Sequence, residues 1–380
     1  MSSASTAVIF ILITTTTTTL FFLPTTTTAA APPQSSFKKI YAFGDSFTDT
    51  GNTKSVGPGG GFGHVSNPPY GSTYFHRPTN RYSDGRLVID FVTQSLSLPL
   101  LPPYRSLRDP RAARNGVNFA VGGATAIKHA FFAKNNLTLD NTPESIQTQL
   151  RWFDEFLASQ GCNGTASASA ACGAAVEDAL FWVGEIGVND YAYILGSEIS
   201  GDVIQRLSVA TVTNFLEALL KRGAKNMVVQ GLPPSGCLTL AMYLAPEDDR
   251  DELGCVRSAN NQTSVHNSIY QSKLDGLRAR YPEASIVYLD YWNAYRSVVR
   301  NPAKYGMKET FKACCGSGDP PYNFNVFATC GTPGAAAVCP DPAHYINWDG
   351  VHLTEGMYRV LADMFVNGTF SSPRFSTLLA

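Results

Sequence analysis

The stretch KIYAFGDSFTDTGN, Lys39 to Asn52, decides the fold. It begins with a short β-branched and aromatic run, which predicts a buried strand that ends at Gly44. Ser46 then lies just beyond the carboxyl end of that strand, close to a helix start, where backbone N–H groups can stabilise a negative charge. This position suits a nucleophile. The alternative interpretation is that Asp45 or Ser46 only caps a helix.

Four more short apolar runs alternate with amphipathic segments along the chain. They are typical of buried strands, and they cover Val117–Val121, Leu180–Val183, Asn226–Gln230 and Ser285–Asp290. Apolar side chains at helical spacing predict helices at 87–98, 146–157, 203–220 and 265–277, and a last helix from Thr354. This alternation predicts an α/β fold with a parallel sheet covered by helices on both faces. Because no internal repeat or linker interrupts it, we expect one domain over residues 36–380.

The first 31 residues differ from the rest. They hold short apolar runs at Ala7–Ile13 and Leu20–Leu23, threonine tracts between and after these runs, and small residues near Ala31. No apolar run reaches the roughly 18 residues that span a bilayer. Residues 1–31 are therefore predicted to be a signal peptide, although no Lys or Arg precedes Lys38. The alternatives are a low-complexity tail or a plastid transit peptide, and the lack of Arg argues against the latter.

Cysteine usage agrees with secretion, because the chain has eight cysteines, an even number. Their order suggests local disulfides between Cys162 and Cys172 and between Cys237 and Cys255. It also suggests pairing of Cys314 and Cys315 with Cys330 and Cys339, in either connectivity. No metal site is expected, since there is no Cys-x-x-Cys or His-Glu-x-x-His spacing. Four glycosylation sequons occur, at Asn136, Asn163, Asn261 and Asn367.

The charge pattern limits the partners. A net charge of -1 gives no reason to expect nucleic acid or an anionic membrane surface as a partner. The glycine-rich run at Gly57–Gly61 lacks the Walker pattern, so we interpret it as a flexible surface loop. We expect a monomer without a membrane span, located outside the cell in the apoplast or cell wall, with the vacuole as the alternative.

Polar or glycine motifs follow the first three predicted strands, at Ser46, Gly123 and Asn189. Because the carboxyl ends of parallel strands meet at one edge of a sheet, these residues are expected to form one site. A backbone N–H at a glycine turn and a primary amide can both stabilise the oxyanion of a tetrahedral intermediate. Alternatively, Gly123 only allows a turn with positive φ and Asn189 is only a turn residue.

A serine nucleophile needs a general base, and two histidines carry an aspartate three residues before them. His352 follows Asp349 just before the last predicted helix, on a turn that can overhang the sheet edge. His344 follows Asp341 in a proline- and cysteine-rich loop, where we expect a structural role. The remaining histidines are expected on the surface or in loops, at His64, His76, His129 and His266.

Four blocks in this order resemble the GDSL esterase/lipase (SGNH hydrolase) family, namely Phe43–Ser46, Asn118–Thr125, Gly187–Asp190 and Asp349–His352. Two further runs, Asn80–Arg86 and Gly231–Cys237, resemble its plant branch. The similarity extends from Lys39 to about Phe365. It implies a flavodoxin-like three-layer α/β/α sandwich with a mainly parallel five-stranded sheet.

The resemblance also implies residue roles. Ser46 would be the nucleophile, His352 the base and Asp349 its orienting carboxylate, and the oxyanion hole would be made by Ser46, Gly123 and Asn189. No metal or organic cofactor is implied. Leu353 departs from the proline that plant members often have after the histidine.

The expected function is hydrolysis of carboxylic esters by a secreted serine enzyme through an acyl-enzyme. The substrate is a small-molecule or polysaccharide ester with an acetyl, phenolic or lipid acyl group, and short or phenolic groups are expected to be preferred. An acyltransferase that uses an alcohol acceptor, and a non-catalytic binding or defence protein, are the alternatives. Five aromatic residues near strand ends either line a substrate pocket or fill the core, namely Trp182, Tyr191, Tyr193, Trp292 and Trp348.

Overall fold

The computed structural model describes residue 1 and residues 37–55, 63–139, 142–332 and 337–379. Residues 35–380 form one compact unit. The predicted signal peptide, apart from Met1, and the predicted surface loop at Gly57–Gly61 lie outside the described residues. Within the described ranges, no helix is both long enough and apolar enough to cross a membrane.

The central sheet has the strand order β2-β1-β3-β4-β5-β8, and the first five of these strands run parallel. This is the flavodoxin-like order, so the predicted α/β fold is confirmed. A sixth strand of two residues, which the sequence did not predict, pairs antiparallel with β5 at the edge. The strands are β1 Lys39–Phe43, β2 Gly116–Asn118, β3 Ala179–Val183, β4 Asn226–Gln230, β5 Ser285–Leu289 and β8 Ser371–Ser372.

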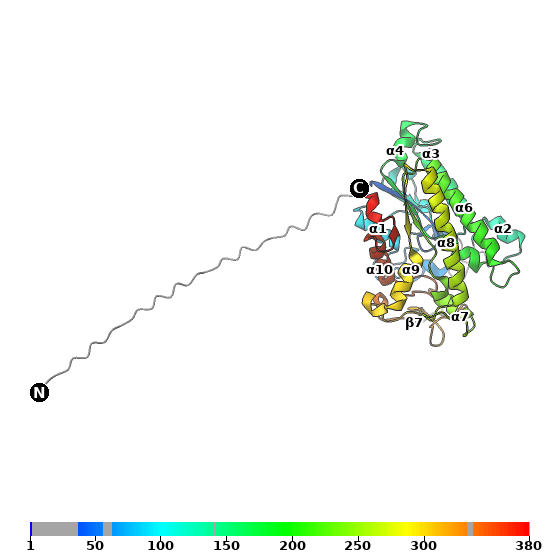
Figure 1. The fold of residues 1–380 in the computed structure, drawn as a ribbon, viewed down its shortest axis with the longest axis vertical. Helices are drawn as coiled ribbons and strands as arrows, with labels where there is room; N and C mark the ends of the chain where they lie inside the picture. The colour runs from blue at the N-terminus through cyan, green and yellow to red at the C-terminus, as the bar shows by residue number, and fades with distance from the viewer. Residues whose placement is uncertain (2–36, 56–62, 140–141, 333–336, 380) are drawn as a thin grey trace. The chain divides into compact units, whose positions relative to one another are not determined.

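Helices cover both faces of the sheet (Figure 1). Alternate side chains of each strand point to opposite faces, so Tyr41 and Phe43 pack into one core and Ile40 and Ala42 into the other. The first core contains side chains of α3 (Ile146–Ser159), α6 (Gly201–Lys221) and α8 (Arg257–Arg280). The second contains side chains of α1 (Val88–Ser95), α9 (Tyr291–Arg300) and α10 (Glu355–Val366).

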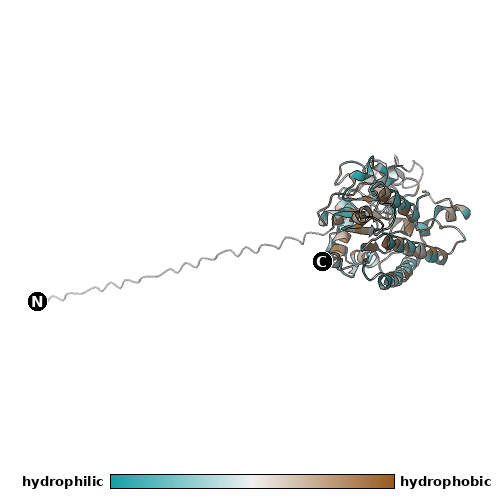
Figure 2. Cartoon of the chain, turned by 90° about the horizontal axis from the view of Figure 1, so that it is seen from above, coloured by the Kyte–Doolittle hydropathy of each residue, from teal (hydrophilic) through white to brown (hydrophobic). Residues whose placement is uncertain are grey.

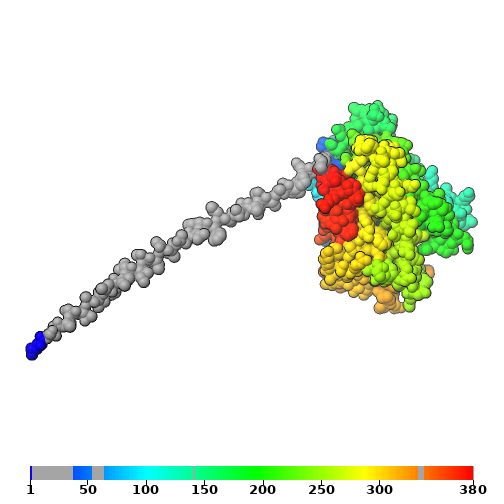
Figure 3. Space-filling model, in the orientation of Figure 1, coloured from blue at the N-terminus to red at the C-terminus, as the bar shows by residue number. Residues whose placement is uncertain are grey.

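Both cores are apolar, and Figure 2 shows the apolar segments gathered in the interior of this unit. In Figure 3 the C-terminal segment, in red, lies beside the yellow part of the chain, which agrees with the pairing of β8 with β5. Shorter elements complete the fold, namely α2 (His129–Lys134), α4 (Ala170–Val176), α5 (Val188–Ala192), α7 (Thr239–Leu244), β6 (Cys315–Gly316) and β7 (Ala337–Val338).

The helix predicted at 265–277 extends over 24 residues, from Arg257 to Arg280. Its amino-terminal half buries polar side chains such as Asn260 and His266, which hides the apolar period. The prediction that His266 lies on the surface or in a loop is therefore wrong, since only 2% of this residue is exposed.

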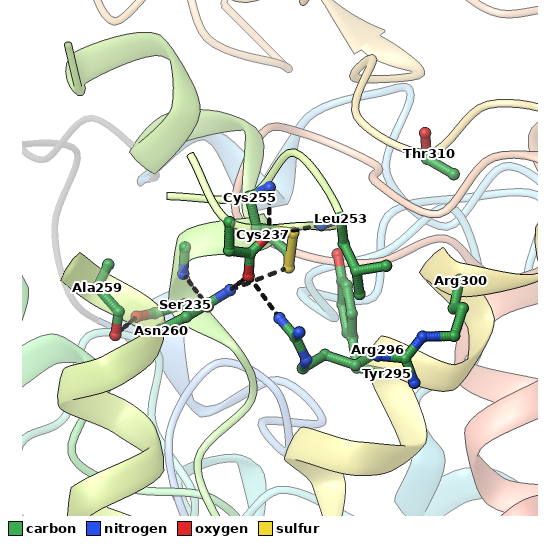
Figure 4. The surroundings of a disulfide bond; sticks show 12 residues. Ser235, Cys237, Leu253, Cys255, Ala259, Asn260, Tyr295, Arg296, Arg300 and Thr310 are labelled. Carbon is green, nitrogen blue, oxygen red and sulfur yellow. Dashed lines mark hydrogen bonds and ion pairs between the residues drawn. A yellow bond between two sulfur atoms is a disulfide. The ribbon is translucent and has the colours of Figure 1, made fainter. Parts of the chain in front are cut away.

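All eight cysteines form disulfides. The two local bridges predicted first are confirmed, and the last four cysteines pair as Cys314–Cys339 and Cys315–Cys330. Figure 4 shows the Cys237–Cys255 bridge between the start of α8 and Arg296 of α9. There the half-buried Asp251 carboxylate accepts hydrogen bonds from Arg296 Nη1 (2.6 Å) and Asn260 Nδ2 (2.9 Å), which ties the disulfide loop to both helices.

The loop at 63–86 is fixed to the sheet edge by a buried ion pair. The Arg81 guanidinium donates to both carboxylate oxygens of Asp90 in α1, at 2.8 and 2.9 Å. It also donates to the Thr50 carbonyl, at 3.2 Å, in the segment that follows Ser46. Both side chains of the ion pair are at most 7% exposed, so neither charge has an alternative partner in water.

We expect Arg81→Met to lower the free energy of unfolding by about 3–5 kcal/mol, because it leaves the Asp90 carboxylate buried without its cation. Denaturant unfolding followed by circular dichroism measures this change. Arg111→Met is the matched control, since the Arg111–Asp109 pair is exposed and should contribute nothing measurable. Equal losses for the two variants would contradict the importance of the buried pair.

Candidate active site

Ser46 lies in a tight turn directly after β1. Gly44 has a φ of 142°, and a Cβ there would come within 3.3 Å of the Glu185 carbonyl oxygen, so only glycine suits this position. The Gln149 side chain of α3 accepts from the Gly44 N–H (2.9 Å) and donates to its carbonyl (2.7 Å). These contacts fix the turn, and Ser46 itself is only 5% exposed.

The structure brings Ser46, His352 and Asp349 together. Ser46 Oγ lies 2.7 Å from His352 Nε2, and His352 Nδ1 lies 2.7 Å from Asp349 Oδ2. Asp349 and His352 lie on the turn before α10, as predicted, and both are buried. This arrangement allows the imidazole to accept the serine proton while the carboxylate stabilises the imidazolium.

Asp349 is held in its ionised form. Burial alone would raise its pKa, but the charge of His352 and hydrogen bonds from its imidazole and from two backbone N–H groups outweigh burial and lower the pKa. Those backbone donors are Val351 N (3.0 Å) and His352 N (2.8 Å), both to Oδ1. The Tyr70 hydroxyl donates to Oδ2 at 2.7 Å.

Two aromatic rings flank the imidazole of His352. The ring centroid of Tyr82 lies 4.4 Å from that of His352, and the centroid of Phe47 lies 5.3 Å away. Tyr82 belongs to the Asn80–Arg86 run. A Cβ on Gly122 would lie 2.5 Å from the Tyr82 ring, so glycine is required there for the ring to reach the histidine.

Gly123 and Asn189 lie beside the same turn. Gly123 has a φ of 79°, and its carbonyl accepts a hydrogen bond from the Tyr193 hydroxyl (2.8 Å). Asn189 Nδ2 donates to Asp45 Oδ2 and to the Ala124 carbonyl, both at 3.0 Å. One of these amide hydrogens must be shared with, or released to, a substrate oxygen before Asn189 can act as an oxyanion donor.

Three buried carboxyl groups surround Asn189. Burial raises the pKa of Asp45 to about 6 and that of Asp190 to about 7, although Asp190 accepts the Ala126 and Ile127 N–H groups at 2.8 Å. Burial, and then the adjacent Asp45 carboxyl, raise the pKa of Glu185 well above its usual range. Within the described residues, neither Glu185 carboxyl oxygen has a hydrogen-bond partner of standard geometry. Burial therefore favours the protonated form of Glu185.

We expect Glu185→Gln to flatten the dependence of stability on pH. The unfolded chain ionises Glu185 near 4.5, whereas the folded protein keeps the proton, so unfolding releases a proton above that pH. The wild-type free energy of unfolding should therefore fall as pH rises from about 4.5, by up to about 1.4 kcal/mol per pH unit for each such group. Urea unfolding from pH 4 to 8 measures this slope.

The matched control is Glu247→Gln, because Glu247 is exposed. It should keep the wild-type slope. If Glu185→Gln also kept that slope, Glu185 would not be the protonated buried carboxyl that we infer.

The other singled-out residues lie elsewhere or serve other roles. His344 Nδ1 donates a hydrogen bond to the Asp341 carboxylate on an exposed turn, and no predicted site residue contacts this pair in the described part of the chain. Trp182 and Trp348 are fully buried core residues, and Tyr191 bonds to the buried His266 at 3.0 Å. Trp292 packs against Arg296, 4.5 Å from ring centroid to guanidinium carbon. Of the five aromatic candidates, Tyr193 donates to the Gly123 carbonyl through its hydroxyl, and Trp348 donates to the His352 carbonyl through its backbone N–H (2.7 Å).

Sequence reasoning missed Tyr70, Tyr82 and Glu185. Tyr70 follows two prolines, Tyr82 lies in the Asn80–Arg86 run, and Glu185 lies two residues before the Gly187–Asp190 block. A buried aromatic next to proline or glycine in a long loop was the available signal, but its contact with a histidine far along the chain is a tertiary property.

The chain belongs to the GDSL-like lipase/acylhydrolase family, whose model matches residues 40–365. It is thus a carboxylic ester hydrolase of the GDSL type. It is 63% identical to a GDSL esterase/lipase of Arabidopsis thaliana over 90% of this chain and 89% of that protein. It is 40% identical to acetylajmalan esterase 2 of Rauvolfia serpentina over 87% of this chain and 90% of that one.

Among solved structures, an acetylxylan esterase from Geobacillus stearothermophilus matches with a TM-score of 0.41 and 13% identity. The match covers 88% of this chain and 95% of that chain.

Proposed function

We propose that this protein is a secreted serine esterase in which Ser46 attacks the ester carbonyl. The observation that carries the proposal is the continuous hydrogen-bonded series from Ser46 Oγ through the imidazole of His352 to Asp349, with 2.7 Å at each step. A serine without such a base is too weak a nucleophile to attack an ester.

In the proposed reaction, His352 Nε2 accepts the Ser46 proton as Oγ bonds to the carbonyl carbon, and the carbonyl oxygen becomes an oxyanion. The Gly123 and Ser46 N–H groups and the Asn189 amide stabilise this charge. The imidazolium then protonates the leaving alcohol, which leaves an acyl-Ser46. Water, deprotonated by His352, attacks the acyl group, and the acid is released as Ser46 regains its proton.

The burial of the nucleophile supports a small acyl group. Ser46 is 5% exposed and His352 is 2% exposed, with aromatic rings on both sides of the imidazole. A long acyl chain would need these surroundings to open. Relatives at 40% and 39% identity are called acetylajmalan esterases, and an acetyl group is the smallest that such a site has to accept. We propose acetyl or other short esters as the preferred substrates.

Secretion is part of the proposal. The predicted signal peptide at 1–31 and the domain at 36–380 are supported by four disulfides, which persist in oxidising compartments. Among the four sequons, Asn367 lies on an exposed turn, where its Oδ1 accepts hydrogen bonds from the Thr369 N–H (2.9 Å) and hydroxyl (2.6 Å). We propose glycosylation there.

We expect Ser46→Ala to lower kcat for a p-nitrophenyl ester by about 10⁴-fold or more, because the acyl-enzyme cannot form. The protein should remain folded, as judged by circular dichroism. Ser95→Ala is the matched control, since Ser95 is an exposed serine on α1. Full turnover by Ser46→Ala would refute both the esterase and the acyltransferase proposals, because the turnover would then not pass through an acyl-Ser46.

We expect kcat/KM to decrease in the order acetyl, feruloyl, palmitoyl across esters of one alcohol, because the buried Ser46 admits small acyl groups most readily. Steady-state kinetics over this series measures the order. Faster turnover of the palmitoyl ester would contradict the proposed substrate class.

Adding an acceptor alcohol and analysing products by mass spectrometry tests the transferase alternative, which predicts acyl transfer in preference to hydrolysis.

A further inference from the structure

The Asp349 carboxylate has a fourth hydrogen-bond donor that the triad does not include. The Tyr70 hydroxyl donates to Asp349 Oδ2 at 2.7 Å, and this is the same oxygen that accepts from His352 Nδ1. Tyr70 is 1% exposed. Its hydroxyl therefore has no competing partner in bulk water, and it contacts the atom through which Asp349 acts on the imidazole.

Tyr70 is held firmly in place. Its N–H donates to the Asn67 carbonyl (3.2 Å), and the following Gly71 N–H donates to the Ser83 carbonyl (3.0 Å). Its ring packs edge-on against Trp348, the residue before Asp349, at 6.0 Å between centroids, and against Tyr82 at 6.3 Å. The phenol is thus fixed by the same small core that supports both ends of the Asp349–His352 pair.

Tyr70 can only donate in this position. Burial, and then the Asp349 charge, raise its pKa well above the usual range, so the phenol stays protonated wherever the enzyme works. A donor on Oδ2 withdraws negative charge from the oxygen that stabilises the imidazolium. It also fixes the direction of that oxygen toward His352 Nδ1.

We propose that Tyr70 is a positioning residue that extends the triad to Tyr70–Asp349–His352–Ser46 and sets the basicity of His352 through Asp349. This inference rests on the proposed function. It adds a determinant of activity that lies in the loop before α1, far in sequence from both the histidine and the aspartate.

The other polar groups around the pair are defined. Ser46 and Tyr82 contact the His352 imidazole, and Asp45 interacts with it through its charge. The Asp349 charge also acts on Tyr82 and Tyr358, but the Tyr82 hydroxyl bonds to Thr53 and the Tyr358 hydroxyl accepts from the Leu353 N–H (3.4 Å). Glu185 lies behind Asp45. Among the described side-chain hydrogen bonds to the Asp349 carboxylate, Tyr70 is the one phenol donor. Its removal should therefore change the carboxylate in a way that the neighbouring tyrosines do not compensate.

The test is Tyr70→Phe, with kcat and KM measured across pH on the acetyl ester. Loss of the donor concentrates charge on Asp349 Oδ2 and favours the imidazolium, so the acidic limb of kcat/KM should move to higher pH by several tenths of a unit. Because Oδ2 is also less well fixed, kcat at the optimum should fall about 5- to 10-fold with KM unchanged. Tyr270→Phe is the matched control, since Tyr270 is also buried, at 4% exposed, but its hydroxyl has no hydrogen-bond partner among the described residues.

Two further measurements separate an effect of the Tyr70 hydroxyl on His352 from an effect of packing. Replacing Tyr70 by 3-fluorotyrosine retains the ring and the hydroxyl but strengthens the donor, so the acidic limb should move the opposite way, to lower pH. Against an Asp349→Ala background, Tyr70→Phe should have no further effect on kcat, because its route to His352 is removed.

An unchanged pH profile in both Tyr70 variants, or a full further loss of kcat in the Asp349→Ala background, would overturn the inference. Either result would leave Tyr70 with a packing role only. Activity retained by Ser46→Ala would instead overturn the proposed function itself, so the two failures are distinguishable.

Discussion

The hydrogen bond between Ser46 Oγ and His352 Nε2 joins two turns that are 306 residues apart in the chain. The parallel sheet explains the position of Ser46 but not that of His352. It places Ser46 after β1 and Asn189 after β3, because neighbouring parallel strands end at one edge. His352 follows no strand of this sheet. Its turn is positioned by α10, which packs with α1 and α9 on one face of the sheet. It is also held by backbone bonds from Leu240 N to the Gly350 carbonyl and from Cys315 N to the Trp348 carbonyl.

Two kinds of buried carboxyl group surround this hydrogen bond. Asp349 is buried with two donors on each oxygen, and it is ionised. Glu185 is equally buried but lacks partners of standard geometry, and it holds its proton. Its closest polar interaction is with the neighbouring Asp45 carboxyl, which also raises the pKa of Glu185. This carboxyl lies next to Asp45, whose Oδ2 accepts a hydrogen bond from the Asn189 amide.

The sequence was sufficient for the sheet and the principal helices because these depend on local periodicity. The strands at β1, β3, β4 and β5 were located almost to the residue, and β8 was missed because two residues carry no periodic signal. α9 was also missed, since its apolar face is mixed with tyrosine and arginine. The candidate site residues were identified from short sequence motifs and not from hydrophobic periodicity. Tyr70, Tyr82 and Glu185 could not be found in this way, because what distinguishes them is contact with residues remote in sequence.

A small third core holds Tyr70 and Tyr82 in contact with the Asp349–His352 pair. It consists of Val65, Tyr70, Tyr82, Cys314, Cys315, Cys330 and Trp348. Two disulfides cross this core. Without cross-links, the irregular loops that form it would lose much conformational entropy on folding. The cross-links reduce that loss by restricting the unfolded chain. This core holds Tyr70 against Asp349 and Tyr82 against His352. The sheet thus positions Ser46 and Asn189, the disulfide-linked core supports the Asp349–His352 turn, and the proposed site forms where the two supports meet.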